Sequence, residues 1–230
     1  MTILHQKYST AEGSVLNRQT LSEQIYELLK KDIMQGRIGF GELLINREIQ
    51  ARFGASSTPV RDAINCLYVD GLVEEITSAG ARVVIFDRPF IQELNEILAV
   101  LEFGAIRRTT QQGIFPQMAA ELEAVVDRQS QAHTIDEYVL LDRKFHLTFF
   151  RCCGNRHLTE SYSRYHALTE ILVRLHGQEP RRRDRCIEQH RLILEACSKG
   201  DQNVLRELVD RHHRHAEEWF FQNEELLKLK

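Results

Sequence analysis

Apolar positions in the first third of the chain recur at the spacing of short helices. Thr20 and Glu23 have the spacing of a capping box, which predicts that a helix begins there, and Gly36 supplies its stop. A second, shorter helix is predicted from about Asn46 to Phe53, where the following glycine breaks the pattern. The first third therefore begins as two helices separated by a glycine-containing loop.

The stretch from Ser56 to Ile64 predicts a third helix. Thr58 has the side chain of an N-cap, and Pro59 suits the first helical position, where a missing N–H costs nothing. The apolar face of this helix consists of Val60, Ala63, Ile64 and Leu67. The outward face carries Thr58, Arg61, Asp62 and Asn65. An ordinary amphipathic helix has the same pattern, so this stretch alone leaves the role of the helix open.

Two short β-prone runs follow the third helix, from Leu72 to Ile76 and from Arg82 to Phe86, and residues 78–80 between them supply a hairpin turn. A short helix, a tight turn containing glycine, a second helix and a hairpin form a winged helix-turn-helix, an arrangement that reads DNA. The sequence therefore predicts a DNA-binding domain at residues 20–87, preceded by a mobile arm at residues 1–19.

From Asp87 onward the strand-like pattern ends and long helical patterns replace it. Glycines and capping residues divide this part into about six helices, predicted at residues 90–113, 116–133, 134–151, 158–176, 180–198 and from 201 onward. The expected fold class is therefore mainly α, with an N-terminal winged helix-turn-helix followed by an all-helical bundle at residues 88–230.

The composition is that of a globular protein without a membrane segment. Of the 230 residues, 43% are hydrophobic and 27% are charged, with no apolar run long enough to cross a bilayer and no secretory signal. The five cysteines are an odd set without a C-x-x-C pair, which predicts reduced thiols in the cytoplasm. The net charge is -3, and residues 18–87 carry 8 Lys/Arg against 10 Asp/Glu. Affinity for DNA must therefore come from the placement of cations and from duplication in a homodimer.

Four polar residues occupy predicted core positions on three helices of the bundle. Asp142 and His146 share one side of the third bundle helix, His190 lies on the apolar stripe of the fifth, and His212 lies on that of the sixth. Such groups are costly to bury without partners. Two explanations remain open: the four side chains hydrogen-bond one another, or they bind a divalent metal such as Zn, Ni, Mn or Fe.

Other charged and imidazole groups of the bundle are expected at the surface. His213 and His215 neighbour His212 but fall off its apolar stripe, so we expect both to be solvated. The run Arg181–Arg183 is interpreted as a solvated helix start, although it could also grip an acid.

The first domain carries a specific set of motifs. They are Gly41-Glu42, Leu44, Arg47-Glu48-Ile49, Phe53-Gly54, Ser56, Thr58-Pro59-Val60-Arg61, Ala63, Leu67, Gly71-Leu72-Val73 and Gly80. With these residues the segment 20–86 resembles the DNA-binding domain of the GntR family of bacterial transcription regulators. The resemblance implies that Arg47, Thr58 and Arg61, with the wing around Gly80, contact double-stranded operator DNA.

Two positions depart from the GntR pattern. The family usually has arginine where this chain has Ser57, which implies that one phosphate or base contact is missing. The family usually has serine where this chain has Ile45, which implies that Asn46 caps the second helix instead. The first departure affects the operator sequence, and neither affects the fold.

The second domain carries its own motifs. They are Asp142-x-x-Phe145-His146, Gly154-Asn155-x-x-Leu158, His190-Arg191-x-Ile193-Leu194-Glu195, Gly200-Asp201 and His212. With these residues the segment 88–228 resembles the FCD ligand-binding domain of the FadR subfamily. The resemblance implies a metal held by Asp142, His146, His190 and His212, with a small carboxylate effector completing the coordination. Many members carry an arginine where this chain has Leu98. This departure implies either an unusual effector or another cation, such as Arg107, that binds the effector instead.

The sequence thus predicts a ligand-responsive transcription regulator, not an enzyme, that acts as a homodimer on operator DNA. Two alternatives remain open: a metal-dependent enzyme acting on a small organic acid, and a metal sensor. The chain has no H-E-x-x-H, G-x-S-x-G or phosphate-loop pattern, and an enzyme would leave residues 20–86 unexplained.

Overall fold

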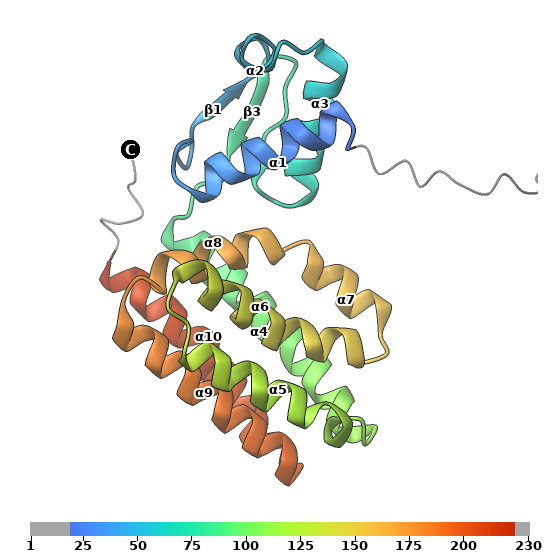
Figure 1. Cartoon of the computed structure of the whole chain (residues 1–230), viewed down its shortest axis with the longest axis vertical. Helices are drawn as coiled ribbons and strands as arrows, with labels where there is room; N and C mark the ends of the chain where they lie inside the picture. Colours follow the sequence, from blue (N-terminus) through green and yellow to red (C-terminus); the bar gives the residue numbers. More distant parts are fainter. Residues whose placement is uncertain (1–18, 224–230) are drawn as a thin grey trace, which may run out of the picture.

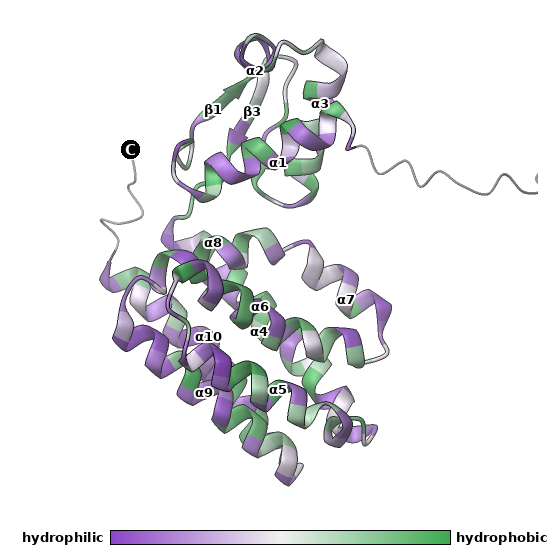
Figure 2. Cartoon of the chain, viewed as in Figure 1, coloured by the Kyte–Doolittle hydropathy of each residue, from purple (hydrophilic) through white to green (hydrophobic). Residues whose placement is uncertain are grey.

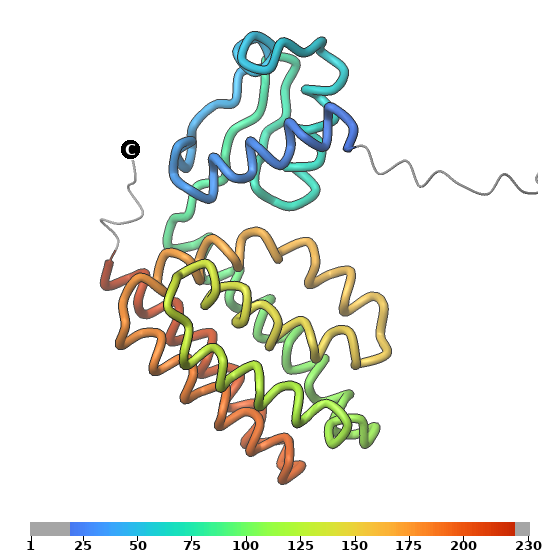
Figure 3. The backbone as a smooth tube through the Cα atoms, viewed as in Figure 1, coloured from blue at the N-terminus to red at the C-terminus, as the bar shows by residue number. Residues whose placement is uncertain are grey.

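The structure, a computed structural model, describes residues 19–223 as two bodies. The first runs from blue to blue-green in Figure 1 and contains the elements from α1 to β3, and the second, from green to red, contains the remaining helices. The chain passes between them once, after the wing (Figure 3). The predicted mobile arm at residues 1–19 lies outside the described residues, except for Gln19.

The first body is a winged helix-turn-helix. Its elements are α1 (Leu21–Met34), β1 (Leu43–Ile45), α2 (Asn46–Phe53), α3 (Ser57–Val69), β2 (Val73–Glu74) and β3 (Gly80–Val83). The predicted capping box is present, because the Glu23 N–H donates to the Thr20 hydroxyl and the Thr20 N–H donates to the Glu23 carboxylate. The sheet is antiparallel in the order β1-β3-β2, and its strand β1 was not predicted from the sequence.

The recognition helix α3 begins two residues earlier than its capping pattern predicted. Ser56, not Thr58, is the N-cap, and it makes no side-chain cap hydrogen bond. Ser57 and Thr58 are therefore helical and exposed. Pro59 still falls within the first turn, where the N–H groups have no partner inside the helix and a proline costs little.

The wing is held against α2 and β1. Ile45, not Asn46, is the N-cap of α2, so the predicted cap is wrong; the Asn46 side chain instead donates to the Ser78 carbonyl at 3.0 Å. At Gly80 the strands β1 and β3 come so close that a Cβ would lie 1.9 Å from the Leu44 carbonyl oxygen. Only glycine fits this approach, which gives Gly80 a packing role whether or not it also touches DNA.

The second body is an all-helical bundle, and the part of it that the structure describes contains seven helices. They are α4 (Arg88–Gln111), α5 (Phe115–Ser130), α6 (Ile135–Cys152), α7 (Arg156–Ser163), α8 (His166–His176), α9 (Pro180–Lys199) and α10 (Gln202–Gln222). The sequence predicted about six, because the break at residues 164–165 that separates α7 from α8 carries no glycine or proline. Asp87, Thr134 and Asp201 cap their helices through side-chain oxygens.

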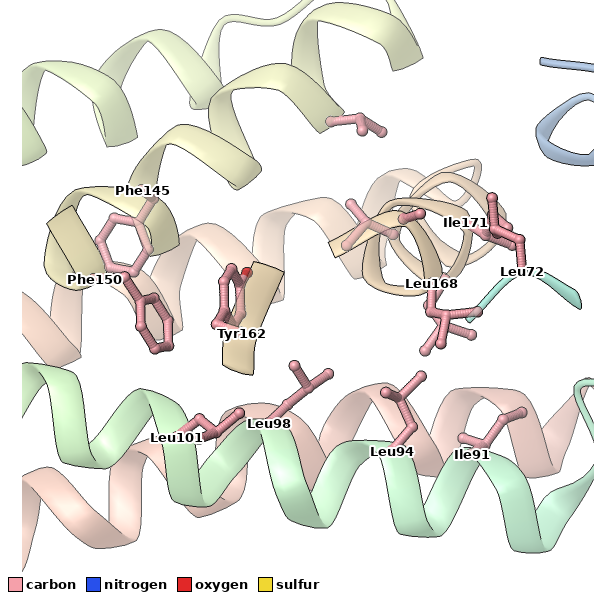
Figure 4. Close-up of a cluster of buried hydrophobic side chains, with 14 of the residues drawn as sticks. Leu72, Ile91, Leu94, Leu98, Leu101, Phe145, Phe150, Tyr162, Leu168 and Ile171 are labelled. Atoms are coloured by element: carbon pink, nitrogen blue, oxygen red, sulfur yellow. The ribbon is translucent and has the colours of Figure 1, made fainter. Parts of the chain in front are cut away.

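Apolar packing continues from the bundle into the winged helix. In Figure 4, Leu72, just after α3, lies beside Leu168 and Ile171 of α8, with Ile91 of α4 nearby. A Cβ on Gly71 would lie 3.2 Å from the Leu168 Cδ1 atom, so the two bodies are in close contact here. The helix α8 therefore packs against the segment that directly follows the recognition helix.

The helices of both bodies carry alternating hydrophilic and hydrophobic bands, as amphipathic helices around a core do (Figure 2). Within residues 19–223, none of these helices combines the length and the hydropathy that a membrane span requires.

Candidate metal centre and DNA-binding face

The structure brings the four predicted metal ligands together inside the bundle. Asp142 and His146 lie one turn apart on α6, His190 is on α9 and His212 is on α10. One ring nitrogen from each histidine lies within 4.8 Å of the others. The Asp142 carboxylate is 3.8 Å from His146 Nε2 and 3.9 Å from His190 Nε2. The three imidazoles thus form one group of potential ligand atoms, and Asp142 shares a second, overlapping group with His190 that does not include His212.

The three imidazoles each use the nitrogen Nδ1 for a hydrogen bond to a neighbouring oxygen. The partners are Glu102 for His146, Gln129 at 2.9 Å for His190 and Gln189 at 3.1 Å for His212. A carboxylate or amide oxygen can only accept, so each Nδ1 carries the proton, and the neutral rings of His190 and His212 keep a free lone pair on Nε2. Burial lowers the pKa of His146, but Glu102 and then Asp142 raise it to about 9, so without a metal this ring also carries a proton on Nε2. Metal-binding histidines in proteins are oriented in this way by their outer hydrogen bonds. The same outer hydrogen bonds also satisfy the buried rings without a metal, so both explanations of these four residues remain open.

Burial also sets the protonation of two of these histidines. Burial lowers the pKa of His190 well below its usual range, and the charge of His146 lowers it further. Burial likewise lowers the pKa of His212, with further contributions from His190 and His146. Both rings are therefore neutral, which is the form that binds a metal.

Glu102 of α4 joins the centre although the sequence analysis did not select it. Its side chain is buried, with 1% of the residue exposed, and it contacts His146 Nδ1 and His213 Nε2, the latter at 2.7 Å. Burial raises the pKa of this carboxyl, but the two histidines, His146 first, hold it well below its usual range. The sequence contained a signal for this residue: Glu102 lies one turn after Leu98, so a charged side chain falls on the apolar side of its helix.

Three residues expected in solvent are instead packed near the centre. His213 is mostly buried against Glu102. His215 is partly buried, with its Nδ1 against Gln189. Arg182 is only 7% exposed. The predictions of solvation were wrong because α10 and α9 are covered on more than one face, so that more than the best apolar stripe is shielded.

A narrow crevice opens beside Asp142. Its walls come from α6, α7 and α8, and the residues that line it are Val139, Asp142, Arg143, Tyr162, His166, Thr169, Glu170 and Val173. Arg143 supplies a cation next to a proposed metal ligand and was missed by the sequence analysis. The crevice reaches α8, which packs against the segment that follows the recognition helix.

The structure does not bring Arg107 into this crevice. Arg107 is exposed on α4, where its guanidinium lies 5.8 Å from the centre of the Phe103 ring. Leu98, at the position where many relatives carry arginine, is 1% exposed and points into the apolar cluster with Tyr162 (Figure 4). The surroundings of Leu98 on α4 are therefore apolar.

Two of the five DNA-binding residues predicted from the sequence, Ser57 and Arg61, line a hollow of the winged helix, whereas Gly80 is buried in β3. A hollow of about 430 Å³ separates α3 from the wing, and it is lined by Asn46, Gln50, Ser57, Arg61, Ile64, Asn65, Ile76, Thr77 and Ser78. Ser57 and Arg61 thus share one hollow with the tip of the wing. Thr58 and Arg47 are exposed near the starts of α3 and α2.

Other arginines of this body have structural partners. The carboxylate of Asp32 is buried and accepts hydrogen bonds from Arg37 at 2.6 Å and from Arg52 at 2.5 Å. These two cations hold the end of α1 against α2 and neutralise a buried charge. Arg61, by contrast, faces the hollow, where an anion can reach it.

Comparison with known proteins finds a matching family model for each of the two bodies. The model of bacterial regulatory proteins of the gntR family matches residues 21–83, and the model of the FCD domain matches residues 93–215. The chain is 28% identical to the Uxu operon regulator of Haemophilus influenzae over 207 residues, which cover 82% of this chain and 77% of that protein. It is 23% identical to the HTH-type transcriptional repressor RspR of Escherichia coli K12, over 88% of this chain and 90% of that protein.

Solved structures share the fold. E. coli McbR/YncC superposes with a TM-score of 0.69 at 21% sequence identity, over 90% of this chain and 100% of that one. At this identity the likeness speaks for the fold alone. Because the FCD model covers more than half of the chain and the gntR model matches the body before it, the chain belongs to the GntR family of DNA-binding transcription regulators, a class without enzymes, and carries an FCD effector-binding domain.

Proposed function

We propose that this regulator responds to a small carboxylate effector through a divalent metal held by Asp142, His146, His190 and His212. The observation that carries the proposal is the convergence of three Nε2 atoms: each Nδ1 is occupied by an outer hydrogen bond, so each Nε2 is left for a metal, which at His146 takes the place of a proton. The donor set fits a borderline metal such as Zn, Ni, Mn or Fe. When bound, the metal supplies positive charge and an open position that a carboxylate can take.

The effector reaches the metal from the crevice beside Asp142. Arg143 is positioned there to pair with a second acidic group, a role that the exposed Arg107 cannot fill from its place on α4. The crevice is too narrow for an organic acid as it stands, so α7 or α8 must shift to admit one. Because Leu168 and Ile171 of α8 pack on the segment after α3, such a shift changes the support of the recognition helix (Figure 4). The acid thereby favours one placement of the DNA-binding body.

Operator binding requires a homodimer. One winged helix presents few cations to DNA, and the chain has a net charge of -3, so a single copy should bind weakly. Two copies that read an inverted repeat double the contacts of Arg47, Ser57, Thr58, Arg61 and the wing at Gly80. The two half-sites should lie about one helical turn apart or closer.

The test begins with metal-free protein and an operator selected from the DNA fragments that the protein retains. Operator affinity is measured by fluorescence anisotropy in matched salt, first without metal, then with each divalent metal, then with a panel of small mono-, di- and tricarboxylates. We expect at least one acid to change the affinity by about 5- to 150-fold, the usual range of allosteric coupling. Identical affinity with and without every acid that binds would refute effector control. A response to metal alone would identify a metal sensor.

A further inference from the structure

Cys186 lies one helical turn before His190 on α9 and faces the same centre. Its Sγ atom is 3.5 Å from Asp142 Oδ1 and 3.7 Å from His190 Nε2. These three residues form a second, overlapping group of donor atoms within 4.8 Å of one another. Cys186 was not among the residues predicted from the sequence. The apolar stripe assigned to this helix consisted of Ile187, His190, Leu194 and Cys197, and Cys186 lies just beside it.

The distances from the sulfur agree with those expected around a metal. Zinc binds sulfur at about 2.3 Å and nitrogen or oxygen at about 2.0 to 2.2 Å, so an angle of about 110° between two ligands at the metal places the sulfur about 3.5 to 3.7 Å from each of the other two donors. The separations of the Cys186 sulfur from Asp142 and His190 fall in this interval. The separation of 3.9 Å between Asp142 Oδ1 and His190 Nε2 has to close by about 0.5 Å to suit the same geometry.

The surroundings of this thiol are polar, unlike those of an inert core cysteine. The Tyr138 hydroxyl is buried next to Cys186 and has no hydrogen-bond partner among residues 19–223. The buried Arg182 guanidinium lies one turn before Cys186 on the same helix. Cys153 provides a contrast, because its thiol donates to the Phe150 carbonyl of its own helix at 3.2 Å. A thiol that only filled space would not need a carboxylate, an imidazole, a phenol and a guanidinium around it.

We infer that Cys186 is a further ligand of the metal that Asp142 and His190 hold, and that it directs the site toward zinc rather than manganese. The inference rests on the metal binding proposed above. As the metal–sulfur bond forms, the S–H bond breaks and the proton leaves to solvent, so that no oxidant or reductant is required. Thiolate is a soft ligand that suits Zn²⁺, whereas Mn²⁺ prefers carboxylates and water.

Two spectroscopic measurements test whether sulfur binds the metal. In the protein loaded with Co²⁺, a cysteine ligand produces a sulfur-to-cobalt charge-transfer band in the near ultraviolet. In the zinc-loaded protein, X-ray absorption should find one sulfur at about 2.3 Å. The test variant is Cys186→Ser, with Cys186→Ala as a second. Cys197→Ser is the matched control, because Cys197 lies on the same helix and both cysteines are 4% exposed.

The charge-transfer band should be present in the parent and in Cys197→Ser and absent from both Cys186 variants. When zinc and manganese compete for the site, the preference for zinc should fall at least about tenfold in Cys186→Ser. A loss of this size is typical when a hydrogen-bond partner of a metal ligand is removed. Fully loaded parent protein without a sulfur signal overturns the inference and leaves the four-ligand site intact. A band that persists in Cys186→Ser also overturns it. Parent protein that binds no metal refutes the proposed site as well. The parent spectra decide the matter even if both variants fail to fold.

Discussion

The winged helix and the bundle place their polar groups in opposite ways. In the winged helix, Arg61 faces an open hollow, and the buried charge of Asp32 serves only to join α1 to α2. In the bundle, His190 and Asp142 are buried in the core, and the polar groups around them hold them in orientation. DNA is a large partner that must be met at a surface, whereas a metal with a small acid can be enclosed. Changes in the two bodies should therefore have different consequences for folding.

The largest effect is expected where a metal ligand is removed from the bundle. His190→Ala and His212→Ala should lose the metal, and with it about 4 kcal/mol of stability when free metal stands at 1,000 times its dissociation constant. Elemental analysis and thermal melts, on protein without a His tag or chelator, measure both. His157→Ala is the control, because this side chain is 75% exposed on α7. Full metal occupancy in both test variants would remove the site.

A buried histidine outside the metal centre should make the bundle sensitive to acid. Burial, with a smaller contribution from Arg182, lowers the pKa of His176 from 6.5 to about 3. Below pH 6.5 the unfolded chain binds a proton that the folded chain excludes, so stability is complete above that pH and is lost as the pH falls toward 3.

Between pH 7 and pH 4.5 this histidine should cost about 2–3 kcal/mol of stability. In His176→Phe, which keeps an aromatic ring against Trp219 and Phe220, the acid dependence of metal-free protein should be weaker by that amount. Urea melts across this pH range measure the difference. Parallel curves for parent and variant would show that His176 is not responsible.

The next effect concerns Glu102, which contacts His146 but is not itself a proposed metal ligand. Glu102→Gln keeps the shape of the side chain but removes the charge that orients His146 and His213, so metal affinity should fall about 10- to 100-fold. Competition with a chelator measures it. Glu121→Gln is the matched control, since Glu121 is exposed and pairs with Lys144 at the surface. An unchanged metal affinity in Glu102→Gln would reduce this carboxylate to a packing role.

The two bodies also differ in how far the sequence predicted them. Capping residues and glycines located most helices, because these signals are local. The four proposed ligands were selected because polar side chains interrupted apolar stripes, and their metal binding stays a prediction. Glu102 and Cys186 were missed, since the stripes alone did not show that their helices converge on the same point. Strand β1 was missed because its pairing with β3 joins segments that are far apart in the sequence.

A smaller effect is expected on the DNA-binding face, and it should leave the fold unchanged. Arg61→Ala should weaken operator binding by about 1–3 kcal/mol if the guanidinium makes a bidentate contact with a base. The melting temperature should stay the same, because Arg61 is exposed at the hollow. Arg156→Ala, exposed on the bundle, is the control. Equal operator affinity of Arg61→Ala and the parent, in matched salt, would refute this assignment.

The smallest effect should come from adding a cation to the same face. Ser57 lines the hollow beside Arg61, at a position where the GntR pattern usually has arginine. If the side chain of Ser57→Arg reaches a phosphate, the plot of log affinity against log salt should steepen by about 0.9 for each half-site, while the melting temperature stays constant. The gain should be similar for operator and for unrelated DNA, because phosphate contacts carry no sequence information. A gain confined to the operator would instead mean that position 57 meets a base edge. An unchanged salt slope would place this position outside the DNA contact.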